Sequence, residues 1–283
     1  MRAIEEYREQ RQELISENAV IRLLAQIEQR QTYQQLLEFK TDIEGSTASS
    51  PWHLAEKFWL DKLEAKLSYM PPNMRDDFQL VEHSEIFRRF SSSQDRPRKL
   101  LVCFSGMFGG LMIPTWAFLA HLPPAVTDVL VIDSRRRFGT AFYQRFQSEW
   151  QNINQKFMEL QQDLHPVANY IYGVSGGATP AVLFACNHQI EKMMLVAAAA
   201  ISDRNFTNID PNFDFSKYTR STTSQTSVLY VFGLRDYIAL RQVPTFLRKF
   251  SQRKLLLDFK SGHDVITRFY RTKRLEGVLK WFE

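Results

Sequence analysis

The stretch YIYGVSGGATPAVLF, residues 170–184, decides the fold. Its first five residues have the length and apolar character of a buried strand, and the residues from Ala178 onward are typical of a helix. Between them lies Gly173-Val174-Ser175-Gly176-Gly177, a Gly-x-Ser-x-Gly motif at the transition from strand to helix. The glycines two positions before and after the serine carry no Cβ and so leave room for a tight turn. The stretch therefore predicts a serine at the transition from a buried strand to a helix.

Segments of strand type and helix type alternate on both sides of this motif. Apolar runs of strand length lie at Leu100–Phe104, Val129–Asp133, Tyr170–Val174, Met193–Ala197, Val228–Phe232 and Leu255–Phe259. Helices are expected at Met112–His121, Phe142–Leu164 and Thr179–Asn187. This alternation predicts an α/β fold with a mainly parallel sheet of about six or more strands, flanked by helices on both faces.

The N-terminal third of the chain has a different texture. Residues 1–95 carry no strong strand signal, and apolar residues from Ile4 to Leu37 recur at roughly the spacing of one helix face. Ser50 and Pro51 are typical of the N-cap and first position of a further helix. We therefore expect a helical N-terminal extension over residues 1–95 and an α/β domain over residues 96–283. The aromatic side chains of the extension predict that it packs on the core. There it would serve as a lid or as the surface through which a homo-oligomer forms.

Composition excludes several classes of protein. The chain has 283 residues, a net charge of +5 and a mean hydropathy of -0.32, values typical of a soluble protein. It has no apolar run of about eighteen residues, which argues against a membrane span. The charged N-terminus lacks a secretory pattern, and Cys103 and Cys186 lack CxxC spacing. We therefore expect a cytoplasmic protein with reduced cysteines and no metal site. Nucleic acid is not expected as a partner, because no basic stripe carries interleaved aromatic residues.

The setting of Ser175 resembles the nucleophile turn of the α/β-hydrolase superfamily, and in particular its compact bacterial members. The resemblance covers roughly residues 97–283. It implies that the nucleophile, an acid and a histidine follow one another along the chain. Asp236 lies just past the end of the predicted strand 228–232, after Gly233-Leu234-Arg235, and His263 lies just past the last predicted strand.

The resemblance gives each of these residues a role. His263 would act as the base that takes the proton of Ser175, and Asp236 would orient the imidazole. All three would meet at the carboxyl edge of the parallel strands, where open α/β sheets bind ligands. Asp203 is the alternative acid, because some members of the superfamily carry the acid one strand earlier.

An oxyanion hole is expected beside the serine. The resemblance implies one donor in the N–H of Gly176 and a second in the loop after the strand Leu100–Phe104. Met107 is the expected second donor, and Gly106 allows the loop to turn. Phe108 in the same loop would form a wall of the acyl pocket.

A second group of charged residues follows a strand at the same sheet edge. Asp133 ends the run Val129–Asp133, and the arginines Arg135, Arg136 and Arg137 follow it. They are either structural or substrate contacts. Arg135 is expected to bind substrate, together with Gly106 and Phe108 of the loop after the strand Leu100–Phe104.

These residues predict a serine enzyme that transfers acyl groups through an acyl-enzyme intermediate. The leading hypothesis is a carboxylic-ester hydrolase that acts on a small acyl ester and requires no cofactor. An O-acetyltransferase would use the same triad on a saccharide hydroxyl, with acetyl-coenzyme A as the acyl donor. A non-catalytic binding module of the same fold is the third hypothesis, although all three triad positions are filled.

Overall fold

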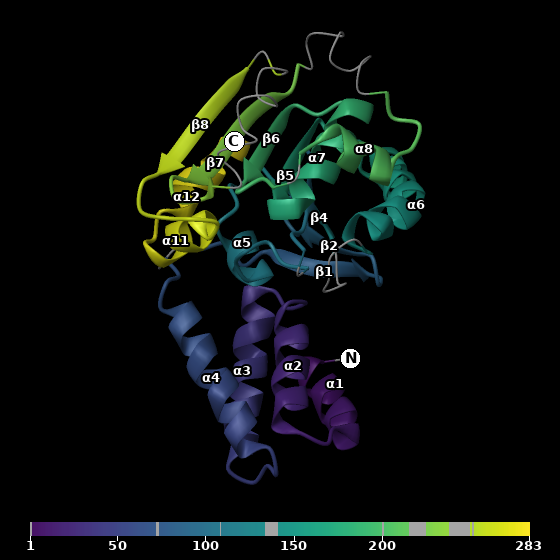
Figure 1. Ribbon diagram of the computed structural model, residues 1–283. Helices are drawn as coiled ribbons and strands as arrows, with labels where there is room; N and C mark the ends of the chain where they lie inside the picture. Colours follow the sequence, from purple (N-terminus) through teal and green to yellow (C-terminus); the bar gives the residue numbers. More distant parts are fainter. Residues whose placement is uncertain are drawn as a thin grey trace.

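The computed structural model describes residues 2–71, 74–107, 109–133, 141–199, 201–214, 225–237, 250 and 252–283. The chain begins with a group of helices that lies below an α/β sheet in the view of Figure 1. These helices are α1 (Ala3–Gln10), α2 (Glu17–Glu28), α3 (Tyr33–Thr47) and α4 (His53–Leu67), with a 3₁₀ turn at Arg11–Glu13. No helix within the described ranges is both long and apolar enough to cross a membrane.

The sheet has eight strands in the order β1-β2-β4-β3-β5-β6-β7-β8. The strands are β1 (Phe78–His83), β2 (Phe87–Ser92), β3 (Lys99–Phe104), β4 (Asp128–Ile132), β5 (Ala168–Val174), β6 (Lys192–Val196), β7 (Ser227–Gly233) and β8 (Arg253–Asp258). Strands β1, β2 and β4 pair antiparallel, and every pair from β4 to β8 is parallel. The predicted mainly parallel sheet of six or more strands is therefore confirmed.

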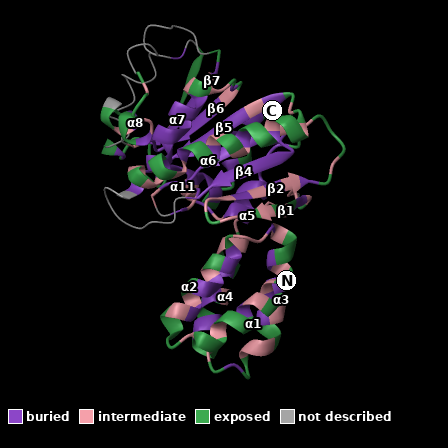
Figure 2. Cartoon of the chain, turned by 90° about the vertical axis from the view of Figure 1, so that its right-hand side faces the viewer, coloured by how far each residue is buried: buried purple, intermediate pink, exposed green. Residues whose placement is uncertain are grey.

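Helices cover both faces of the sheet. One face packs against α5 (Thr115–Ala120), α11 (Val265–Arg271) and α12 (Leu275–Leu279), and the other against α6 (Ala141–Leu164), α7 (Ala178–Asn187) and α8 (Asp203–Ile209). Strand β3 shows why the strands of the parallel part have continuously apolar sequences. Leu101 and Cys103 belong to the first cluster, whereas Leu100, Val102 and Phe104 belong to the second. Both sides of such a strand are buried, as the purple strands of Figure 2 show.

The prediction that residues 1–95 are helical is wrong for the segment 78–92, which forms the hairpin of β1 and β2. The reason lies in the inward-facing positions of β2. These are Arg88, Phe90 and Ser92, and two of the three are polar. The period-two pattern that would reveal a half-buried strand is therefore hidden.

The N-terminal helices pack on the α5 and α11 side of the sheet through buried polar contacts. The Glu28 carboxylate of α2 accepts hydrogen bonds from the indole N–H groups of Trp59 in α4 (3.1 Å) and Trp116 in α5 (3.2 Å). The Lys66 ammonium donates to the same carboxylate at 2.7 Å. The Tyr270 hydroxyl of α11 in turn donates to the backbone carbonyl of Lys66. The N-terminal helices are thus hydrogen-bonded to α5 and α11, which cover one face of the sheet.

Candidate active site

Ser175 lies on a strained turn between β5 and α7. Its φ of +53° falls in the left-handed region, which side-chain-bearing residues rarely adopt. The two glycines of the motif make this turn possible. A Cβ on Gly173 would lie 2.6 Å from Cβ of Ala181, and one on Gly177 would lie 2.3 Å from the carbonyl oxygen of Ser105. Neither position has room for a side chain, so strand, turn and helix pack closely around the serine.

Ser175, His263 and Asp236 form a continuous hydrogen-bonded chain. The Ser175 hydroxyl oxygen is 2.8 Å from Nε2 of His263, and Nδ1 of His263 is 2.8 Å from Oδ2 of Asp236. The Asp236 side chain is 3% exposed, whereas that of His263 is 43% exposed. When Nδ1–H donates to the buried carboxylate, Nε2 of the neutral ring is left as an acceptor for the serine hydroxyl. The structure brings the three predicted residues together.

Two loops hold Asp236 and His263 in place. Strand β7 ends at Gly233, and the N–H of Arg235 donates to the Ser261 carbonyl at 3.1 Å. A Cβ on Gly233 would lie 2.3 Å from that same carbonyl oxygen. The loop that carries Asp236 can therefore touch the loop that carries His263 only because residue 233 is glycine.

The loop after β3 lies beside the serine, as expected for an oxyanion loop. The N–H of Gly106 donates to the Gly110 carbonyl at 3.0 Å, so the loop closes on itself. A Cβ on Gly106 would lie 3.4 Å from Cβ of Ser175, and one on Gly176 would lie 3.4 Å from Cγ of Met107. No described residue accepts a hydrogen bond from the Met107 N–H. Gly176 belongs to the first turn of a helical segment, where backbone N–H groups have no partner within the helix.

The structure leaves most of the other predicted site residues undescribed and gives Asp133 an internal partner. Phe108 and Arg135 lie outside the described residues, as does the side chain of Asp203. Asp133 is buried and forms a bidentate ion pair with Arg88, at 2.8 Å to Nε and 2.9 Å to Nη2. Its role in this structure is therefore an internal ion pair rather than a substrate contact.

Sequence reasoning missed one aromatic residue at the site. Phe142, in the first turn of α6, lies against Gly176, and an added Cβ on that glycine would be 2.9 Å from its ring. No local sequence signal distinguishes Phe142 from the other apolar residues of its helix, because the contact joins two layers of the fold.

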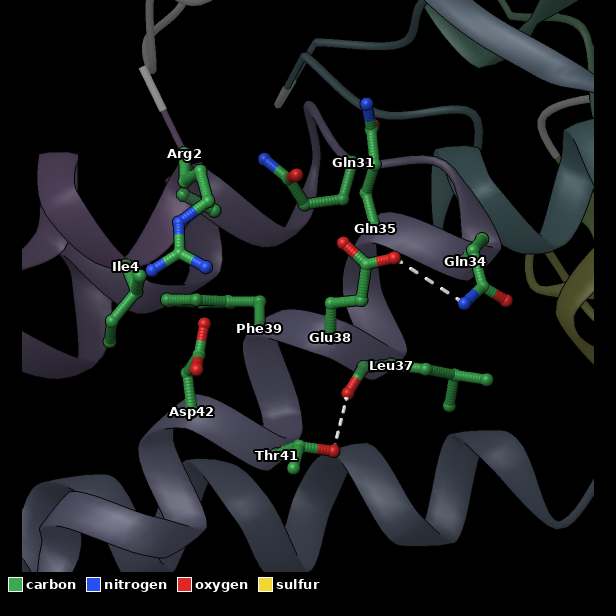
Figure 3. A pocket seen from close by; sticks show the side chains of 11 residues that line it. Arg2, Ile4, Gln31, Gln34, Gln35, Leu37, Glu38, Phe39, Thr41 and Asp42 are labelled. Atoms are coloured by element: carbon green, nitrogen blue, oxygen red, sulfur yellow. Dashed lines mark hydrogen bonds between the residues drawn. The ribbon is translucent and has the colours of Figure 1, made fainter.

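A separate hollow of about 660 Å³ lies in the helical part (Figure 3). Its lining comes entirely from α1, α3 and the residues just before them, including Arg2, Gln34, Glu38 and Asp42. None of Ser175, His263 and Asp236 lines it. Among the described residues there is also no cluster of three or more histidine, cysteine or acidic side chains that could hold a metal.

The sequence matches no protein-family model and no curated protein. Solved structures do resemble it. The virulence factor BioJ of Francisella is 12% identical and superposes with a TM-score of 0.51 over 92% of this chain and 97% of its own. An acylaminoacyl peptidase from Pyrococcus horikoshii is 12% identical, with a TM-score of 0.49 over 76% of this chain and 42% of its own.

An α/β serine hydrolase homologue from Coxiella burnetii is 13% identical, with a TM-score of 0.48 over 74% of this chain and 96% of its own. At 12% identity, the superposition on BioJ with its TM-score of 0.51 establishes the fold and nothing more. The mainly parallel sheet and the position of Ser175 after β5 support the same assignment. The chain has the α/β-hydrolase fold.

Proposed function

We propose that the protein is a serine-dependent acyl-transfer enzyme, and specifically a carboxylic-ester hydrolase that acts on a small acyl ester. The observation that carries the proposal is the hydrogen-bonded chain from Asp236 through His263 to Ser175, with 2.8 Å at each link. A serine hydroxyl is a weak nucleophile until a neutral imidazole can remove its proton. Here the imidazole is at hydrogen-bond distance, and a buried carboxylate fixes its orientation.

In the first half of the reaction, Nε2 of His263 takes the hydroxyl proton while Oγ of Ser175 attacks the ester carbonyl. The carbonyl π electrons move onto its oxygen, and a tetrahedral intermediate forms. This intermediate collapses as the imidazolium returns the proton to the departing alcohol. An acyl group then remains on Ser175. Asp236 stays ionised and stabilises the positive charge on His263 between the two proton transfers.

In the second half, water takes the place of the alcohol. His263 removes a proton from the water, whose oxygen attacks the acyl carbon. The carboxylic acid then departs, and Oγ of Ser175 recovers its proton. The acyl group on Ser175 can also be transferred to another hydroxyl, if that hydroxyl reaches His263 before water does. The acceptor must therefore be identified by experiment.

The proposed oxyanion donors are the N–H groups of Gly176 and Met107. Gly176 follows the nucleophile directly, and a Cβ added to it would lie 3.4 Å from Cγ of Met107, so the two residues are neighbours in space. Each donor aimed at the developing negative charge typically stabilises the transition state by about 3 to 4 kcal/mol. Because both are backbone groups, no side chain has to change its rotamer to place them.

The test is covalent labelling by a fluorophosphonate, read as intact mass. Wild type is compared with Ser175→Ala and His263→Ala, and with Ser148→Ala, an exposed serine of α6, as matched control. We expect one adduct per chain in wild type and in Ser148→Ala, none in Ser175→Ala, and much slower labelling in His263→Ala. The same four proteins are then assayed for hydrolysis of p-nitrophenyl acetate.

Equal labelling of wild type and Ser175→Ala would overturn the proposal and favour a binding module. If the triad does react, addition of saccharide acceptors, with acetyl-coenzyme A as donor, separates a hydrolase from an O-acetyltransferase. A hydrolase releases free acid at a rate that the acceptor does not change. A transferase forms the acetylated sugar at the expense of free acid.

A further inference from the structure

We infer that Phe142, together with the Met107 side chain, limits the acyl group to a short chain. This inference rests on the proposed function, because it assigns the acyl specificity of the Ser175 site. It concerns a residue that is neither nucleophile, base nor oxyanion donor, and that comes from a different layer of the fold.

The geometry places both side chains against the residue that follows the nucleophile. A Cβ on Gly176 would lie 2.9 Å and 3.1 Å from two atoms of the Phe142 ring, and 3.4 Å from Cγ of Met107. The ring and the thioether side chain therefore fill the space that a side chain at position 176 would otherwise occupy. These two side chains form one wall beside the nucleophile. In an acyl-enzyme with the proposed oxyanion hole, the carbonyl oxygen lies beside the Gly176 N–H, so the acyl chain begins close to this wall.

The wall is rigid. Phe142 is 1% exposed, and its ring packs edge-on against Tyr143 at 5.1 Å and against Phe146 at 5.0 Å between ring centroids. The Tyr143 side chain is hydrogen-bonded to Thr179 in the first turn of α7, which joins the start of α6 to the nucleophile helix. Phe142 therefore cannot swing away without disrupting the packing of two helices.

The size of the effect follows from close packing. A methyl group, as in acetate, adds little volume next to the wall. Each further methylene must either displace the ring or bend away from it, and pockets of this kind discriminate by about tenfold to a hundredfold per misfit group. We expect the wild-type enzyme to prefer acetate over hexanoate esters by at least about tenfold in kcat/KM.

The experiment compares kcat/KM for p-nitrophenyl acetate, butyrate and hexanoate in wild type and two alanine variants. Phe142→Ala opens space beside Gly176, whereas Phe146→Ala removes a ring of the same size from the same helix and the same cluster. Phe146 is 3% exposed, so the two variants lose similar packing. Phe142→Ala should lower the acetate-to-hexanoate ratio about tenfold or more. Phe146→Ala should leave that ratio at the wild-type value.

The inference is overturned if Phe142→Ala and Phe146→Ala keep the same ratio as wild type while both still label with fluorophosphonate. It is also overturned if wild type already prefers hexanoate. Failure of wild type to label would instead refute the proposed function, so the two failures are distinguishable. If Phe142→Ala does not unfold cooperatively, Phe142→Leu replaces it. Leucine keeps an apolar filling but removes the ring edge, and it should lower the ratio in the same direction.

Discussion

The ion pair between Arg88 and Asp133 allows a direct test of how much the buried polar contacts between the N-terminal helices and the sheet contribute to the free energy of unfolding. Both side chains are 2% exposed, and the two hydrogen bonds measure 2.8 and 2.9 Å. The Arg88 guanidinium also donates to the backbone carbonyl of Gln29, at the end of α2, and to Thr115 at 3.3 Å. One buried arginine therefore joins β2, β4, α2 and α5.

The perturbation is Asp133→Asn, which keeps the size of the side chain but removes its charge. The guanidinium then stays buried without a counter-ion, and loss of one partner from such a pair costs about 3 to 5 kcal/mol. Arg88→Met should cost a similar amount, because it removes the bidentate guanidinium partner of the buried Asp133 carboxylate. The double variant Arg88→Met, Asp133→Leu removes both charges. Its remaining loss should be about 1 to 3 kcal/mol, for the Gln29 carbonyl that loses its donor.

The assay is urea unfolding followed by tryptophan fluorescence, with the urea midpoint and slope converted to a free energy of unfolding. The exposed pair Glu276–Lys280 is the control, at 3.6 Å with side chains more than half exposed. Glu276→Gln should change the free energy by less than about 1 kcal/mol. The reasoning is refuted if Asp133→Asn behaves like Glu276→Gln, or if the double variant loses the sum of the two single losses.

Three further outcomes follow from the same structure. Gly177→Ala should destabilise the protein and abolish labelling of the nucleophile, because its Cβ would meet a backbone oxygen at 2.3 Å; Gly45→Ala, in α3 with open space around it, should raise the melting temperature. Burial lowers the pKa of His188 to about 4, below the value of about 6.5 expected in the unfolded chain. The unfolded state therefore binds more protons, so stability should fall as the pH drops from about 6.5 toward 4, and His188→Gln should flatten the melting temperature over that range. Asp236→Asn should lower kcat about a thousandfold to ten-thousandfold, whereas an equal loss in Asp203→Asn alone would show that the acid is assigned to the wrong strand.

The parallel part of the fold was predictable from the sequence because burial on both faces leaves a plain signature. All six strands from β3 onward were predicted to within a few residues. The hairpin of β1 and β2 was not, since the inward position of Arg88 is charged and reads as a surface residue. Its burial is tolerated because it makes a bidentate contact with Asp133, 45 residues further along the chain, and donates to Gln29 and Thr115 as well.

The candidate site also has a part that could be predicted from the sequence and a part that could not. The proximity of Ser175, Asp236 and His263 could be predicted because each follows a strand, and parallel strands bring their carboxyl ends to one edge. Phe142 could not be found, because its importance depends on how α6 lies against the turn at Gly176. Such a contact between layers leaves no trace in local periodicity.

The hydrogen bond from Tyr270 to the Lys66 carbonyl has a consequence for synthesis on the ribosome. Its two partners are 204 residues apart. At about 5 to 20 residues per second, about 10 to 40 s pass between the emergence of α4 and that of α11. During this interval the nascent N-terminal helices lack the surface that α11 provides for Tyr69 and its neighbours. The growing chain therefore carries an unfinished apolar surface through most of its translation, and a chaperone that binds such surfaces would meet it before His263 has been made.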